Sequence, residues 1–295
     1  MEREQIRISV RNLVEFILRS GDIDNRRASL DTMEAMQAGS RLHRKIQKKM
    51  GSTYHAEVPL NIIIEEENYE LGIWGRADGI IIEETVTIDE IKGVYLSLDL
   101  LEEPVKVHLA QAKCYAYIYG IQNDLQKINV QMTYGNLDTG DLKYFSYEYS
   151  MQQLQEWFSD LILKYKKWAD FQYEWRKKRQ ASIKELAFPF PYREGQKELA
   201  AGVYRTIARK KNLFIQAPTG VGKTISTLYP AIKAVGEGLG DKIFYLTAKT
   251  VTANVAKETL GILCEKGYRA KSVQITAKEK LCPCEEVDCN PVSCP

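Results

Sequence analysis

The residues whose types and spacing most clearly carry chemistry form one short run, Ala217-Pro218-Thr219-Gly220-Val221-Gly222-Lys223-Thr224. The run follows an apolar segment and precedes a helical pattern, which is the context of a phosphate-binding loop. Gly220 and Gly222 let backbone N–H groups fold around phosphates. Lys223 would neutralise phosphate charge, and Thr224 would offer its hydroxyl to Mg²⁺. A chance glycine-rich turn is the alternative, but the preceding strand, the spacing and the Lys-Thr pair all favour a nucleotide site.

A second group of reactive side chains lies in two strand-like segments of the first half. If residues 83–85 form a turn, a hairpin centred on residue 84 pairs Asp78 with Glu90. Strand periodicity places Lys92 on the same face as Glu90. Adjacent carboxylates repel unless they share a proton or a cation, and Mg²⁺ or Mn²⁺ is the usual cation. With the nearby amine, this trio predicts phosphodiester cleavage, whereas an exposed hairpin with ordinary charges is the alternative.

The cysteines are concentrated at the end of the chain. Four of the six lie in the last fourteen residues, namely Cys282, Cys284, Cys289 and Cys294. Zinc sites usually contain Cys-x-x-Cys pairs, which these spacings do not match, and four thiolates can equally hold an iron–sulfur cluster. The residues alone leave zinc, an iron–sulfur cluster and unligated thiols open.

The elements that must position these groups differ between the two halves. Apolar patterning in the first half predicts helices over 5–19, 30–50 and 107–119, and strands over 58–64, 71–82, 86–94 and 128–134. A long amphipathic helix over 151–179 ends in a basic cluster that marks the boundary. In the second half, predicted strands over 212–216 and 242–246 alternate with helices over 224–235 and 251–264. This alternation predicts a parallel sheet.

Length and composition set the class of protein. The chain has 295 residues, of which 44% are hydrophobic and 27% charged, and it contains no apolar run of membrane-spanning length. The first residues lack a secretory pattern. We therefore expect a soluble, cytoplasmic, two-domain protein with no membrane partner. The net charge of +2 combines −4 over 1–180 with +6 over 181–295, so the second half is where an anionic partner is sought first.

The surroundings of the phosphate loop resemble superfamily 2 helicases of the DinG/XPD type. Three segments carry the resemblance: Tyr192-Arg193-Glu194-Gly195-Gln196, Phe244-Tyr245-Leu246-Thr247-Ala248-Lys249-Thr250 and Thr276-Ala277-Lys278-Glu279-Lys280-Leu281-Cys282. They are similar to the adenine-side element, motif Ia and the start of the iron–sulfur insert. The resemblance implies that Arg193 and Gln196 bind ATP, that the cysteines hold a 4Fe-4S cluster, and that translocation on DNA runs 5′ to 3′.

One departure from that family matters. No Asp-Glu-x-His follows the phosphate loop, and the Asp89-Glu90 dipeptide precedes it by more than a hundred residues. Without that carboxylate and a second motor domain, the chain would not complete ATP hydrolysis. We therefore expect the N-terminal part of a longer helicase, ending inside its cluster domain, with the missing C-terminal motor domain as its partner.

The first half resembles the RecB-like PD-(D/E)XK nucleases, including CRISPR-associated exonucleases. The motifs occur in the family's order: Gly39-Ser40-Arg41-Leu42-His43, a Gly-x-x-Asp ending at Asp78, Glu90-x-Lys92 and Gln111-x-x-x-Tyr115. The resemblance implies that His43, Asp78 and Glu90 bind metal, that Asp78, Glu90 and Lys92 are catalytic, and that Gln111 and Tyr115 contact the DNA backbone. The family's four-cysteine nuclease cluster is absent, since Cys114 stands alone in this half.

Together these patterns predict an α/β protein: a mixed-sheet PD-(D/E)XK nuclease-like domain over 1–180, then a partial RecA-like P-loop motor domain over 181–295 with the start of an iron–sulfur insert. The expected function is an ATP-dependent DNA helicase fused to a metal-dependent nuclease in DNA repair. It would act on single-stranded or forked DNA with ATP, Mg²⁺ or Mn²⁺, and a 4Fe-4S cluster. Two alternatives remain, a nucleic-acid-binding protein with an inactive nuclease fold and a P-loop ATPase with a zinc-binding terminus.

Overall fold

The computed structural model describes residues 3–20, 32–218, 220–248, 250–284 and 287. The chain divides into two compact units, one running to Asp170 and the other comprising Phe171–Pro283. Helix α4 (Met151–Glu185) passes through the boundary. Among the described helices, none has the length and apolar character needed to cross a bilayer.

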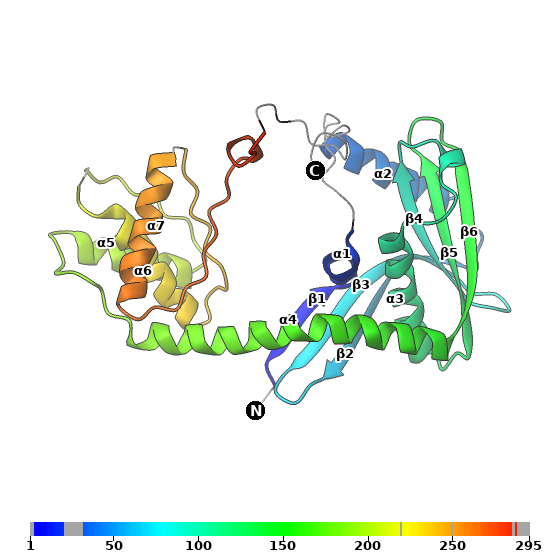
Figure 1. Cartoon of the computed structure of the whole chain (residues 1–295), viewed down its shortest axis with the longest axis horizontal. Helices are drawn as coiled ribbons and strands as arrows, with labels where there is room; N and C mark the ends of the chain where they lie inside the picture. Colours follow the sequence, from blue (N-terminus) through cyan, green and yellow to red (C-terminus); the bar gives the residue numbers. More distant parts are fainter. Residues whose placement is uncertain (1–2, 21–31, 219, 249, 285–286, 288–295) are drawn as a thin grey trace. The chain divides into compact units, whose positions relative to one another are not determined.

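The first unit is built on a mixed sheet (Figure 1). Its strands are β1 (Gln5–Ser9), β2 (Tyr54–Glu65), β3 (Glu70–Ile81), β4 (Thr87–Val94), β5 (Lys127–Asn136) and β6 (Leu142–Ser150). They are ordered β1-β3-β4-β5-β6, with β2 also paired to β3. The β1–β3 and β4–β5 pairs are parallel and the others antiparallel. The predicted mixed α/β class is therefore confirmed.

The sheet forks along one edge of β3. Strand β2 pairs with β3 along nearly its whole length, so β1 and β4 must share the opposite edge. Strand β1 takes Glu70–Trp74 and β4 takes only Gly79–Ile81. Backbone groups between these two stretches need other partners, because buried N–H groups are almost always bonded. The gap between β1 and β4 on this edge of β3 thus leaves room for side chains.

Three helices cover the sheet of this unit. They are α1 (Val10–Leu18), α2 (Thr32–Gln47) and α3 (Lys106–Gln122), and the short turn η1 (Leu98–Leu100) lies between β4 and α3 in the chain. Helix α3 packs on β4 and β5 and against α1, while α2 lies against β4. The fully buried side chains include Ile6, Leu13, Leu71, Ile73, Ile80, Ile88, Ile118, Ile128, Met132 and Tyr134. Burying each large apolar side chain stabilises the fold by roughly 1.5–3 kcal/mol.

Two predictions for the first unit were wrong or incomplete. The predicted helix over 5–19 is a strand, β1, followed by α1, whose N-cap Ser9 accepts a hydrogen bond from the Asn12 N–H at 3.1 Å. The alternating Ile6 and Ile8 suit a strand beside β3, and that tertiary pairing outweighs local helical periodicity. Strand β6 was not predicted, because its tyrosines stand on a half-exposed edge without clean apolar alternation.

The second unit is helical in its described part. It contains α5 (Gln196–Ala208), α6 (Lys223–Gly236), α7 (Thr250–Glu265) and the turn η2 (Lys278–Lys280), together with the end of α4. Its core joins Ile183 and Leu186 to Ile232 and Leu263. Helix α5 was not predicted, whereas α6 and α7 match the expected helices closely.

The two strands predicted for the second unit, over 212–216 and 242–246, are not found as strands. Neither segment pairs with another in the described residues of this unit. Their apolar side chains face solvent, with Phe214 94% and Phe244 78% exposed. A parallel strand is stable only when neighbouring strands satisfy its backbone and cover its faces. Apolar patterning marks such segments as strand-like, but it does not supply those neighbours.

Candidate functional site

Three carboxylates lie in one row across β2, β3 and β4. The β3–β4 ladder pairs Gly79 with Asp89, so Asp78 stands opposite Glu90, and the predicted hairpin centred on residue 84 is confirmed. The β2–β3 ladder runs from Tyr54 paired with Ile81 to Glu65 paired with Glu70, and in that register Glu57 stands opposite Asp78. Residues opposite one another on neighbouring strands present their side chains to the same face. The row Glu57–Asp78–Glu90 therefore crosses the sheet at the fork.

Helix α2 supplies an imidazole and an amide to this row. Its buried Leu42 and Ile46 pack with Ile91 of β4, which fixes the rotation of the helix. Nδ1 of His43 consequently lies 3.5 Å from Oδ1 of Asp78. One turn later, Nε2 of Gln47 donates to a Glu57 carboxylate oxygen and to the Asp78 carbonyl, both at 3.0 Å. A helix presents residues four apart on one face, so both side chains reach the row.

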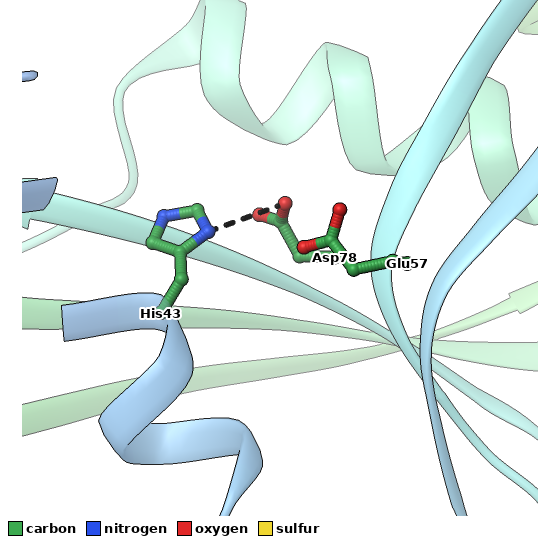
Figure 2. Close-up of side chains that lie close together, drawn as sticks. All are labelled: His43, Glu57 and Asp78. Carbon is green, nitrogen blue, oxygen red and sulfur yellow. Dashed lines mark ion pairs between the residues drawn. The ribbon is translucent and has the colours of Figure 1, made fainter. Parts of the chain in front are cut away.

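One possible cation site is formed by His43, Glu57 and Asp78. Each offers a ligand atom, and these atoms all lie within 4.8 Å of one another. Figure 2 shows the imidazole facing the Asp78 carboxylate, with the Glu57 carboxylate beside it. Carboxylate oxygens suit Mg²⁺ and Mn²⁺, and an imidazole adds affinity for transition metals. The predicted ligand Glu90 is not part of this tight group.

Glu90 is completely buried, and only one of its two carboxylate oxygens has a hydrogen-bond partner. One of its carboxylate oxygens lies 2.6 Å from Nζ of Lys92, whereas Oε2 has no hydrogen-bond partner. Burial raises the pKa of Glu90 to about 8, the Lys92 charge opposes this rise, and the Asp78 charge adds to it. A buried carboxylate oxygen without a partner is costly unless it has a further role. Its position beside Asp78 fits a cation ligand.

The predicted DNA-contacting residues on α3 lie beside Lys92. Oε1 of Gln111 accepts a hydrogen bond from Nζ of Lys92 at 3.3 Å, and its amide donates to the Tyr115 hydroxyl at 3.4 Å. That hydroxyl also accepts from the Arg76 N–H at 3.4 Å, a donor that the forked sheet leaves without a strand partner. Burial raises the pKa of the Tyr115 phenol. In this structure Gln111 and Tyr115 thus hold the Lys92 amine and the backbone of β3 in place.

A second buried acid, Asp89, is held by hydrogen bonds within the sheet. Its carboxylate accepts hydrogen bonds from Tyr54 at 3.1 Å, from Gln131 at 3.2 Å and from Thr133 at 2.5 Å. Burial raises its pKa, and these three hydrogen bonds oppose the rise. Asp89 alternates with Glu90 along β4, so it points away from the carboxylate row. This network ties β4 to β2 and β5 beneath the site.

Sequence reasoning missed Glu57 and Gln47. The register argument that paired Asp78 with Glu90 also applies to the β2–β3 hairpin, whose turn is closed by the Glu66 N–H bonding to the Tyr69 carbonyl at 3.0 Å. Counting outward from that turn places Glu57 opposite Asp78. Gln47 follows His43 by one helical turn, which is itself a signal that both face the same site.

The phosphate loop of the second unit has the expected local geometry. Helix α6 begins at Lys223, and Gly220 and Gly222 have φ of +82° and +76°, which side chains disfavour. Nζ of Lys223 donates to the carbonyls of Ala217 at 2.9 Å and Pro218 at 2.6 Å, so the amine lies within the loop. Thr224 lies at the N-terminus of α6, as predicted.

The two residues predicted on the adenine side contact this loop. The guanidinium of Arg193 donates to the Gly220 carbonyl. The buried Gln196 donates to the Val221 carbonyl at 3.3 Å and accepts from the Arg193 N–H at 3.0 Å. A Cβ on Gly222 would lie 2.5 Å from the Gln196 amide, so an added side chain would displace that amide from the loop. The predicted nucleotide residues are therefore brought together.

The structure describes only two of the four cysteines near the end of the chain. Cys282 is half-buried and Cys284 is exposed, both after η2. Cys289 and Cys294 lie outside the described residues. The four-thiolate site therefore stays a prediction.

Comparisons with known proteins give partial matches. No protein-family profile matches the chain. A probable ATP-dependent helicase, MJ0942 of Methanocaldococcus jannaschii, is 51% identical over 51 residues, which is 17% of this chain and 8% of that protein. The matched segment thus spans a small fraction of the relative's length. The solved structure of SSO0001 aligns with 55% of this chain and 78% of its own, at 20% identity and a TM-score of 0.35.

Proposed function

We propose that the chain is part of an ATP-dependent DNA helicase joined to a metal-dependent DNA nuclease. The observation that carries the nuclease half is the convergence of His43, Asp78, Glu90 and Lys92 at the sheet fork. In particular, the buried Oε2 of Glu90 has no protein partner. An ordinary charged hairpin would leave these groups exposed and solvated, but Glu90 is fully buried. The nuclease domain would comprise residues 1–180.

The donor set fits a divalent cation of the Mg²⁺ or Mn²⁺ class. His43, Asp78 and Glu90 would hold it, and when bound it would supply activation of water and neutralisation of phosphate charge. The ammonium of Lys92, held by Glu90 and Gln111, would stabilise negative charge on the attacking or leaving oxygen. Gln111 and Tyr115 would position the DNA backbone beside the amine. The reaction is hydrolysis of a phosphodiester bond.

The helicase half rests on the phosphate loop and on the partial match to a protein named a probable ATP-dependent helicase. Residues 181–295 would belong to the first motor domain, with Arg193, Gln196, Gly220, Gly222, Lys223 and Thr224 binding ATP and Mg²⁺. The DinG-type polarity of 5′ to 3′, the 4Fe-4S cluster on the terminal cysteines and a role in cytoplasmic DNA repair belong to the same proposal. Single-stranded or forked DNA would be the substrate.

The nuclease proposal is tested with Mn²⁺ and single-stranded DNA. The wild-type chain should cut the DNA, and Asp78→Ala and Lys92→Ala should not, while circular dichroism shows that both variants stay folded. Glu84→Gln, an exposed acid in the turn of the same hairpin, is the matched control. Binding of DNA without cleavage by the wild type would instead support an inactive nuclease fold.

The cluster proposal has a separate test. Anaerobically purified protein should show visible iron–sulfur charge-transfer absorption that is lost in Cys282→Ser. Stoichiometric zinc with no visible absorption would favour the zinc-terminus alternative.

A further inference from the structure

Glu57 has no role in the nuclease proposal above, yet three features bring it to the same site. It stands opposite Asp78 in the β2–β3 register. Its carboxylate lies within 4.8 Å of ligand atoms of both His43 and Asp78. Its φ is +57°, in the left-handed region that side-chain-bearing residues rarely adopt inside a strand. The backbone at this position thus departs from strand geometry where the side chain meets the site.

The partners of Glu57 hold its carboxylate in place. Gln47 donates to one oxygen at 3.0 Å, and Nε of Arg76 lies 2.7 Å from the other. The Arg76 side chain is 67% exposed, so its guanidinium can leave without disturbing the core. Gln47 also donates to the Asp78 carbonyl, which couples the position of Glu57 to the strand that carries Asp78.

A second, independent observation indicates that this row takes a cation. Oε2 of Glu90 is completely buried and has no hydrogen-bond partner, and Glu90 stands opposite Asp78 on the other side from Glu57. The carboxylates of Glu57 and Asp78 lie together on this face, so a cation there would meet several oxygen donors. The unpaired oxygen identifies the same face as a place for a positive ligand.

We propose that Glu57 is a ligand to the divalent cation of this site, and that the cation replaces Arg76 as the partner of the Glu57 carboxylate. The inference rests on the proposed function, since it concerns the same metal site. It extends the ligand set to a side chain from β2, so that three adjacent strands and α2 all contribute. Arg76 then acts as a competing positive charge that occupies Glu57 when no cation is bound.

The test measures binding of Mn²⁺ alone to the whole chain by isothermal titration calorimetry and by electron paramagnetic resonance. Glu57→Gln should weaken Mn²⁺ binding by about tenfold or more, in the range seen when groups around a metal are removed. Glu65→Gln, which removes an exposed carboxylate from the same strand, should leave it unchanged. Arg76→Ala should tighten binding severalfold, because it removes the competing charge.

The outcomes separate the two proposals. If the wild type binds Mn²⁺ and Asp78→Asn abolishes binding, but Glu57→Gln behaves like Glu65→Gln, the role of Glu57 is refuted while the nuclease proposal stands. If Asp78→Asn binds Mn²⁺ as the wild type does, both are refuted. If circular dichroism shows that Glu57→Gln does not fold, Arg76→Ala decides, and an unchanged affinity in that variant would overturn the inference.

Discussion

The two candidate sites of this protein are built in opposite ways. The phosphate loop uses consecutive residues, and its shape comes from two glycines with positive φ and the start of α6. The carboxylate site uses side chains from three strands and two helices that are far apart in the chain. The described glycines of the loop have positive φ with no paired strand beside them, whereas the carboxylate row exists only because β2, β3 and β4 pair with one another. A local motif thus depends on its own residues, whereas a dispersed site depends on the pairing of several strands.

The largest expected effect comes from a substitution that disrupts the carboxylate site but leaves the sheet folded. Glu90→Gln should reduce Mn²⁺-dependent DNA cleavage by about a hundredfold or more, the scale of losing one charge-stabilising group. The variant should nevertheless be at least as stable as the wild type at pH 8, because burial penalises the ionised carboxylate. Cleavage assays and thermal unfolding of the metal-free protein measure the two effects. A large loss of stability would mean that Glu90 is structural.

The second prediction concerns the local site. Lys223→Ala should lower affinity for a fluorescent ATP analogue with Mg²⁺ by about tenfold or more, because it removes the amine that neutralises phosphate charge. DNA cleavage by the other unit should be unchanged. Lys197→Ala, at an exposed position on α5, is the control. Equal affinities for the two variants would contradict a phosphate-binding role for the loop.

A third, smaller effect tests how tightly α3 is held at the fork. A Cβ on Gly75 would lie 2.7 Å from the ring and hydroxyl of Tyr115. Gly75→Ala should therefore destabilise the first unit by about 1–3 kcal/mol, the usual cost of overpacking. Gly51→Ala, where a Cβ meets nothing within 4 Å, is the matched control. Urea unfolding followed by circular dichroism compares them, and equal midpoints would show that Tyr115 moves freely.

The smallest expected effect is a pH dependence of stability that arises from His108 on α3. Nδ1 of His108 lies 3.0 Å from the Tyr134 hydroxyl, and burial, aided by the Lys92 and Arg11 charges, lowers its pKa to about 4. Because the folded state resists protonation, stability should fall as the pH drops from 6.5 towards 4. By linkage, His108 should contribute about 1–2 kcal/mol of this loss at pH 5.

The measurement compares thermal unfolding of the wild type and His108→Gln between pH 4 and pH 7. The variant should show a shallower loss of stability, while His55→Gln, at an exposed position on β2, should follow the wild type. Parallel curves for all three proteins would argue against a neutral, buried His108.

In the first unit, local sequence patterns predicted one hairpin register correctly and one strand wrongly. The turn at residues 83–85 determined which residues face one another in the β3–β4 hairpin, and the structure has that register. The β2–β3 hairpin obeys the same rule, since its turn at residues 66–69 places Glu57 opposite Asp78. The β1 segment was misassigned because its helical periodicity continued into α1, and only its parallel pairing with β3 distinguishes the two elements.

The sequence by itself determined the features that depend on neighbours along the chain. These are the glycines of the phosphate loop, the start of α6, the hairpin register and the long amphipathic α4. Only the tertiary structure decided the fork between β1 and β4, the unpaired oxygen of Glu90 and the meeting of Glu57 with His43. These features depend on contacts between residues distant in sequence, and local propensity carries no information about such contacts. For the same reason, the apolar segments at 212–216 and 242–246 resemble strands in the sequence and remain unpaired in the described structure.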